Sequence, residues 1–298
     1  MAKLLLEASI MLLVFGIGLQ ETVADATHLL RHPALLAKTV VSMFVVMPVL
    51  AILITAAFPL SAPVRLALVA LAVSPVPPFL PSRTAKAGGA GAYTIGLLVA
   101  TSLLAVVIIP AWLWSYGQWR GVAVETPVAA IVRIIALTVL GPLLLGLAVR
   151  RFAPSATRAG TPLTKIATIV LAAAAAFAVA REWPAFRTLV GDGTLVSIVA
   201  VTVGGLAAGH FLGGPSRAER AVLSLATASR HPGVAIAIAT VNAPEDAATS
   251  RIVAAIVLAL VVSAVTATPY VRWSGRRRAL LEGSGVKHDA RHRQHAHQ

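Results

Sequence analysis

The chain has no cysteine and few charged residues. Without cysteine, a disulfide framework, a thiolate metal site and a thiol nucleophile are excluded. Charged residues make up 12% of its 298 residues, whereas a soluble domain carries about 25%. Hydrophobic residues make up 58%, and the mean hydropathy is +0.85. This composition leaves too little polar surface for a water-soluble globule, so we expect a lipid bilayer as the main partner of the chain.

Catalytic signatures are also missing from the sequence. It contains no H-E-x-x-H, no G-x-S-x-G, no G-x-x-x-x-G-K-[ST] and no G-x-G-x-x-G opening a helix after a strand. Glu7 is the only acidic residue well inside a predicted membrane span. We therefore expect that the protein is not an enzyme, and that it uses no cofactor except, in one interpretation, Na⁺ as a coupling ion.

Apolar runs of suitable length predict membrane-spanning helices throughout the chain. A helix needs about 17–25 apolar residues to cross the hydrocarbon core. About nine such runs are present, which predicts an all-α polytopic membrane protein. The predicted spans are Leu4–Leu19, Ala34–Ala57, Val64–Phe79, Ala92–Trp114, Val128–Ala148, Thr164–Ala180, Thr194–Leu212, Ala218–Val241 and Ile252–Thr268.

The net charge of +14 would favour nucleic acid as the partner of a soluble protein. Here Lys and Arg lie between the apolar spans or near the C-terminus, so membrane topology explains them and we expect no nucleic acid partner. The positive-inside rule is satisfied with the N-terminus outside and the C-terminus cytoplasmic. We therefore predict a multi-pass protein of the cytoplasmic (inner) membrane. The predicted cytoplasmic cations include Arg31, Lys38, Arg83, Lys86, Arg150, Arg151, Arg158, Lys165, Arg217 and Arg220.

Two predicted spans carry the same interruption at the same distance from an arginine. Arg65–Pro78 reads RLALVALAVSPVPP, and Arg220–Gly233 reads RAVLSLATASRHPG. In each, a serine follows the arginine by nine residues and a proline follows it by twelve. Proline removes a backbone donor and disfavours helix in the residue before it. Both spans are therefore predicted to be discontinuous helices.

Matched breaks in two halves of a membrane protein point to the central site of a secondary transporter. In hydrocarbon, the freed backbone groups must be satisfied by protein or by a water-lined cavity, so we expect the two breaks to meet and cross. On the predicted topology, the trio in 34–114 starts from the cytoplasm and the trio in 194–268 from outside, which makes an inverted repeat. The alternative is two ordinary proline kinks, which membrane helices tolerate.

Polar residues and glycines cluster at the two breaks, where they are candidates for binding a substrate or an ion. Arg230 can recognise a carboxylate, sulfate or phosphate, or it can brace a carbonyl of the other broken helix. Sodium can be held near Ser74, Thr227 and Ser229 by hydroxyls and unwound carbonyls. The candidate set is Ser74, Pro77, Lys86, Gly88, Gly89, Thr101, Ser102, Thr227, Ser229, Arg230, His231, Pro232 and Gly233.

These segments resemble those of the bile acid:sodium symporter family. Gly18–Phe58 resembles the family's opening, with a helix ending in Gly-Leu, a polar loop and a helix carrying Met47-Pro48. Pro75–Pro110, with its Lys-Ala-Gly-Gly step, resembles the first broken helix and its successor, and Ala226–Ala239 resembles the second. The resemblance spans roughly residues 10–270 and places the chain with bacterial members of the wider bile, arsenite and riboflavin transporter-like group.

The resemblance implies a membrane transporter domain over residues 1–275, divided into a core and a panel that move against each other. The core would comprise the spans near 34–114 and 194–268, and the panel those near 4–19, 128–148 and 164–180. Residues 276–298 are basic and His-rich, and we expect a disordered cytoplasmic tail, with metal binding as the alternative.

Residues that bind sodium in the family's bile acid transporters differ here. Ala226 stands at the position of a glutamate, and Arg230-His231 stand at a Gln-Asn pair. Ala92-Tyr93 stand where a Ser-Asn step is expected. The resemblance thus implies sodium symport, but the residues leave the coupling open.

The leading hypothesis is a secondary active transporter of a small organic anion. Within transport, the alternatives are a sodium-independent uniporter or a proton-coupled exchanger, as in arsenite-type or auxin-type relatives of similar architecture. A membrane enzyme or a sensor that does not transport is the competing class. An enzyme would need a convergent nucleophile, base or metal site, whereas a matched pair of polar broken helices favours transport.

The predicted topology can be tested with one engineered cysteine. Gly283→Cys should react with a membrane-permeant maleimide in intact cells but not with an impermeant one, because the C-terminus is predicted to be cytoplasmic. The parent chain lacks cysteine and is the blank. Labelling by the impermeant reagent from outside would overturn the topology.

Overall fold

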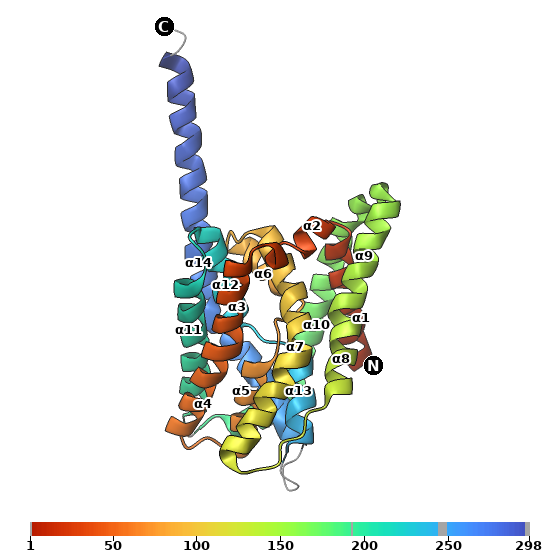
Figure 1. Ribbon diagram of the computed structural model, residues 1–298, viewed down its shortest axis with the longest axis vertical. Helices are drawn as coiled ribbons and strands as arrows, with labels where there is room; N and C mark the ends of the chain where they lie inside the picture. Colours follow the sequence, from red (N-terminus) through yellow and green to blue (C-terminus); the bar gives the residue numbers. More distant parts are fainter. Residues whose placement is uncertain (1, 192, 244–248, 296–298) are drawn as a thin grey trace.

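The computed structural model describes residues 2–191, 193–243 and 249–295, with side chains described for 5–191, 193–243 and 249–277. These residues form helices and connecting segments without a strand, so the predicted all-α class is confirmed (Figure 1). The α-helices are α1 (Ala2–Gly18), α2 (Val23–Ala26), α3 (Pro33–Val40), α4 (Met47–Ala57), α5 (Ala62–Val73), α6 (Leu80–Lys86), α7 (Gly91–Arg120), α8 (Val128–Ile135), α9 (Gly141–Phe152), α10 (Thr157–Leu189), α11 (Thr194–Leu212), α12 (Arg217–Ala228), α13 (Pro232–Val241) and α14 (Thr249–His295). Two π-helical stretches, η2 (Val41–Val46) and η3 (Ala136–Leu140), join α3 to α4 and α8 to α9, and η1 (Leu29–Arg31) and η4 (Pro154–Ala156) are short 3₁₀ turns.

Among the described residues, seven helical segments are long and apolar enough to cross a membrane. Two shorter apolar helices, Leu5–Gly18 and Ala62–Val73, lie at the predicted first and third spans. The predicted all-α polytopic membrane fold is therefore confirmed, while the count of about nine spans and the inverted repeat stay predictions.

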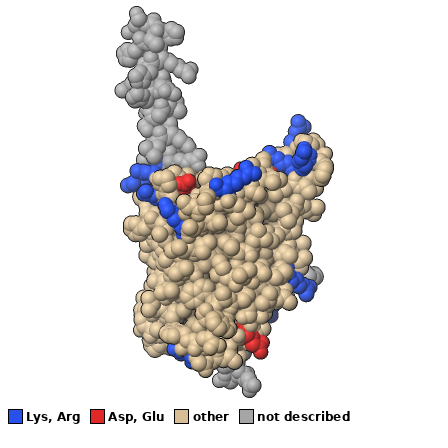
Figure 2. Space-filling view, in the orientation of Figure 1, with Lys and Arg blue, Asp and Glu red and all other residues tan. Residues whose placement is uncertain are grey.

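The helices run between two ends of the molecule. In Figure 1, α7 and α10 run from the end that holds α2 and α6 to the opposite end, and α11 and α14 run back. Lys and Arg gather along the α2 and α6 end, and the middle of the face shown in Figure 2 carries almost no charge. A band of uncharged surface between two charged rims is the surface that a bilayer requires.

Two helices are longer than their sequences predicted. The predicted spans Ala92–Trp114 and Ile252–Thr268 stop short of the helix ends, because α7 continues through Pro110 to Arg120 and α14 continues through Pro269. Proline removes one backbone donor, but its fixed φ is compatible with a helix, and apolar surroundings in a membrane keep such a helix intact. The backbone of 276–295 continues α14 as helix, and the side chains beyond residue 277 lie outside the described residues, so the disorder or metal binding expected of 276–298 stays a prediction.

Each π-helical stretch precedes a proline in the second position of the following helix. η2 is followed by Pro48 and η3 by Pro142. A π-helical turn is wider than an α-helical one, and proline cannot donate to the carbonyl four or five residues before it. Before Pro48 those carbonyls belong to Phe44 and Met43. The Phe44 carbonyl accepts a hydrogen bond from the Trp112 indole, and the Met43 carbonyl is free for a partner outside its own helix.

Helices α1, α9 and α10 pack together through glycines (Figure 1). A Cβ on Gly146 of α9 would lie 2.5 Å from the Phe15 carbonyl oxygen and 2.8 Å from the Gly18 Cα of α1. On the opposite face of α1, Gly16 lies against Gly160 of α10. Such close backbone approach between membrane helices requires small residues. The three helices belong to spans assigned to the predicted panel, and that division stays a prediction.

Gly146→Ala should destabilise the protein, because the added methyl group must push α1 and α9 apart. We expect the free energy of unfolding to fall by about 1–3 kcal/mol, as for overpacking elsewhere. Thermal unfolding of the purified protein in detergent measures the change. Gly91→Ala is the matched control, because its Cβ would meet nothing within 4 Å. Equal unfolding midpoints for the two variants would contradict the packing argument.

Candidate functional site

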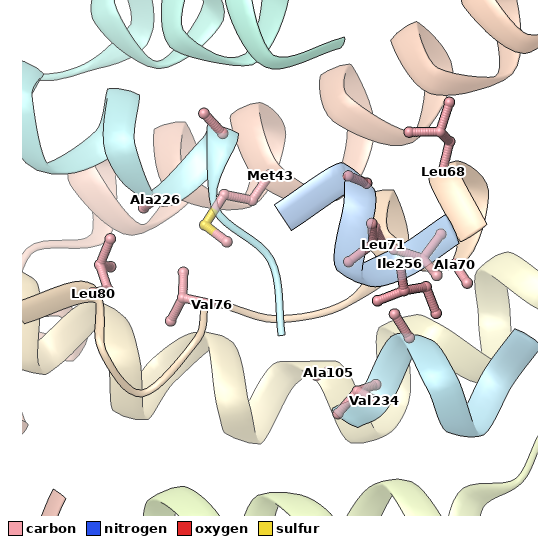
Figure 3. Packing of buried hydrophobic residues seen from close by; sticks show 14 of the residues in the cluster. Met43, Leu68, Ala70, Leu71, Val76, Leu80, Ala105, Ala226, Val234 and Ile256 are labelled. Carbon is pink, nitrogen blue, oxygen red and sulfur yellow. The ribbon is translucent and has the colours of Figure 1, made fainter. Parts of the chain in front are cut away.

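The two predicted breaks are present and lie in contact, as the sequence predicted. The backbone leaves helical conformation at Ser74, after α5, and at Ser229, after α12. The His231 backbone N–H donates to the Pro75 carbonyl at 2.9 Å, which ties one break to the other. Figure 3 shows Met43, Val76 and Ala226 gathered around this crossing, and all three are fully buried. The Pro75 carbonyl and the His231 N–H are thus satisfied by each other within the protein, as hydrocarbon surroundings require.

Arg230 binds the crossing together through its guanidinium group. Its Nη1 donates to the Ser74 carbonyl at 3.0 Å, and its Nη2 donates to the Met43 carbonyl at 2.9 Å. The side chain is only 3% exposed. The first acceptor is a carbonyl of the other broken helix, and the second is the carbonyl released by Pro48. Arg230 therefore braces three segments, and its Nε is left without a hydrogen-bond partner.

His231, which contacts Thr138, and one pair of hydroxyls complete the polar interior of the crossing. The His231 Nδ1 accepts from the Val234 N–H at 3.4 Å, which makes Nε2 the protonated nitrogen of a neutral ring. Nε2 then donates to the Thr138 hydroxyl at 3.2 Å. Thr227 contacts the Ser42 hydroxyl at 2.7 Å. An imidazole that already caps α13 is poorly placed to carry protons.

The other predicted residues are divided between the crossing and more distant positions. Pro77, Pro232 and Gly233 lie in or next to the breaks, whereas Thr101 and Ser102 are buried within α7. Thr101 donates to the carbonyl four residues before it.

The Lys-Ala-Gly-Gly step lies at the end of α6, away from the crossing. Lys86 is exposed there. Gly88 has a φ of +74°, which favours glycine. A Cβ on Gly89 would lie 2.8 Å from Val222 of α12, so this glycine permits close packing of the two broken helices.

Sequence reasoning missed Arg83, Met43, Ser42 and Thr138 as parts of the site. Arg83 donates through Nη1 to the Ser229 hydroxyl at 3.3 Å and is half-buried. It was counted with the cations of a cytoplasmic loop, since it lies three residues before Lys86. For Met43, the available signal was the proline five residues later.

Several cavities adjoin these residues. A small one of about 80 Å³ lies beside the crossing, and Arg83, Ser229 and Arg230 are among the residues that line it. A larger one of about 540 Å³ lies between α1, α6 and α10. Its charged lining residues are Glu21, Lys86 and Lys165.

The residues present fit sodium poorly at the crossing. A sodium ion near Ser74, Thr227 and Ser229 would need free oxygen ligands. The Ser74 carbonyl accepts from Arg230, the Ser74 hydroxyl donates to the Ala70 carbonyl at 2.7 Å, and the Ser229 hydroxyl accepts from Arg83. The described residues contain no group of three His, Cys, Asp or Glu side chains able to hold a metal. Two guanidinium groups also oppose a cation at this position.

Comparison with known proteins agrees with this architecture. The model of the sodium bile acid symporter family matches residues 8–183, which reach from α1 into α10 and include the first broken helix. No curated protein matches the chain. Because the matched segment is more than half of the chain, the protein belongs to the sodium bile acid symporter family.

Proposed function

We propose that the protein is a secondary transporter of a small organic anion across the cytoplasmic membrane, and that its transport does not require sodium. Family membership and the apolar helices make it a multi-pass membrane transporter of the bile acid:sodium symporter type. The observation that carries the finer proposal is Arg230, a buried cation that bridges both broken helices. A membrane enzyme or sensor has no comparable support.

The cavity between α1, α6 and α10 is the candidate substrate site. Its volume of about 540 Å³ lies within the range of about 300–1,000 Å³ that small-molecule pockets occupy. Lys86 and Lys165 supply two cations, against one acid, Glu21. This balance favours an anion whose charge meets the lysines and whose apolar part packs on Leu13 and Ile17.

The coupling proposal rests on the charge at the crossing. In the relatives that the resemblance invokes, bound sodium brings positive charge to the broken helices. Here Arg230 carries that positive charge permanently, and it donates a hydrogen bond to the Ser74 carbonyl. Proton coupling through His231 is the second candidate, but its ring is neutral and committed at both nitrogens to Val234 and Thr138.

Arg230→Gln should abolish uptake, while replacing sodium by potassium should leave uptake by the parent unchanged. The substitution removes the charge and one of the two carbonyl contacts, and a buried carbonyl without a partner is costly. Uptake of radiolabelled organic anions into proteoliposomes measures the effect, with a conjugated bile acid and smaller carboxylates as the panel. Sodium, proton and voltage gradients are imposed separately.

Two variants separate lost charge from lost folding. Arg230→Lys keeps the charge and should retain part of the uptake, and Arg251→Gln removes an exposed arginine at the start of α14 and should behave as the parent. Each variant is first checked for an unchanged elution profile in detergent. Steep dependence of the parent's uptake on sodium would refute the coupling proposal, and the family's usual mechanism would remain.

Uptake should rise as the pH on the cytoplasmic side falls, and Glu21→Gln should remove that rise. Burial, and then the nearby Asp25, raise the pKa of the Glu21 carboxyl above its ordinary value. Below that pKa the carboxyl is neutral, so the lysines of the cavity face an anion unopposed; above it, the ionised carboxylate repels the anion. Initial uptake rates across a pH series measure this. Glu182→Gln, away from the cavity, is the control, and an identical pH profile in Glu21→Gln and the parent would contradict the assignment.

A further inference from the structure

The small cavity beside the crossing has two cations in its wall and no carboxylate among its described lining residues. Arg230 is 97% buried, since only 3% of its surface is exposed, and its Nε hydrogen has no acceptor. A buried guanidinium group without a counter-charge costs several kcal/mol, which carbonyl dipoles offset only in part. The cavity therefore combines a donor that lacks an acceptor with a positive charge that lacks a counterion.

Arg83 is the second cation of this cavity. Its Nη1 donates to the Ser229 hydroxyl, and its positive charge opposes a further cation in the cavity. Ser229 is 6% exposed and accepts from Arg83, so its own hydrogen can be donated into the cavity. The Arg230 Nε, the Ser229 hydroxyl and the remaining N–H groups of Arg83 form a set of donors without an acidic acceptor.

Arg83 also lines a second, open cavity of about 500 Å³, so it lies at the boundary between the small cavity and the rim. Lys86, Arg272 and Arg276 line this open cavity with it, and no Asp or Glu does so among the described residues. Clefts lined by one sign of charge concentrate ions of the opposite sign. The open cavity therefore provides a basic route from solvent to Arg83.

We propose that the small cavity binds a halide-sized inorganic anion, with chloride as the physiological candidate, as the counterion of Arg230 and Arg83. A volume of about 80 Å³ exceeds the 10–15 Å³ that one buried water needs, but it lies far below the 300 Å³ of a typical small-molecule pocket. A halide fits this space, and an organic anion of the size carried in the cavity between α1, α6 and α10 does not. The two anion sites are thus distinct, and chloride binding does not depend on the identity of the transported anion.

Chloride binding is tested on the purified full-length protein in detergent. Sodium gluconate is replaced stepwise by sodium chloride at constant ionic strength, and the thermal unfolding midpoint is followed. A ligand that binds only the folded state raises this midpoint in a saturable way. We expect saturation with chloride and bromide but not with sulfate, which is too large and too strongly hydrated. Crystals soaked in bromide should show an anomalous peak between Arg83 and Arg230.

Variants connect the effect to this cavity. Arg83→Gln should weaken the apparent chloride affinity about tenfold or more. A hydrogen bond to a charged group contributes enough free energy to change a dissociation constant about tenfold. Ser229→Ala removes a single donor without removing charge, and should weaken the affinity several-fold. It also provides a second test if Arg83→Gln fails to fold. Arg251→Gln, at an exposed position, should match the parent.

Three results would overturn the proposal. One is an equal unfolding midpoint in chloride and gluconate. Another is a chloride dependence that is the same in the parent, Arg83→Gln and Ser229→Ala. The third is a bromide-soaked crystal without an anomalous peak in the cavity. None of these measurements uses transport, so failure of the organic-anion assay and failure of chloride binding can be told apart.

Discussion

The contact on which the rest of the structure depends is the guanidinium bridge from Arg230 to the Ser74 and Met43 carbonyls. Both carbonyls are released by proline chemistry: Ser74 lies at the start of a proline-rich break, and Met43 lies five residues before Pro48. In a bilayer, each released carbonyl would cost several kcal/mol if it had no donor. One side chain with several fixed donors satisfies both, and thereby holds two broken helices and η2 in one arrangement.

Arg230 stabilises the crossing, whereas the proposed substrate site is the cavity between α1, α6 and α10. The crossing is braced by the Arg230 side chain, which is covalently part of the protein, and in the proposed function its geometry would not depend on an ion gradient. The cavity between α1, α6 and α10 lies instead at the boundary between α6 and the pair α1 and α10. Glycines allow α1 to pack closely against α9 and α10. A change in that boundary would alter access to the cavity without breaking the contacts of Arg230. In the proposed function, the charge that holds the fold and the charges that would meet the substrate are therefore carried by different residues.

Much of the architecture could be predicted from the sequence, because the length of an apolar run and the position of a proline determine the conformation of the segment that contains them. The span at 194–212 coincides with α11, and the paired serine and proline spacings located both breaks. The role of Arg230 stayed open, since its acceptors come from residues more than 150 positions away. Arg83 was read only as a loop cation, because sequence does not show that a side chain near the rim reaches inward to Ser229. The ends of α7 and α14 were predicted too early, since a proline such as Pro269 does not by itself reveal whether neighbouring helices support the turn before it.

The shortage of acidic residues noted at the level of composition has its physical consequence at the crossing. A crossing of two broken helices only requires that the released backbone groups be satisfied, and either an ion or a side chain can do so. Ala226, Arg230 and His231 stand at positions where the resemblance implies sodium ligands. Replacing oxygen ligands by a guanidinium donor reverses the sign of the charge that the remaining space accepts. The small cavity lined by Arg83 and Arg230 is therefore expected to favour an anion over a cation.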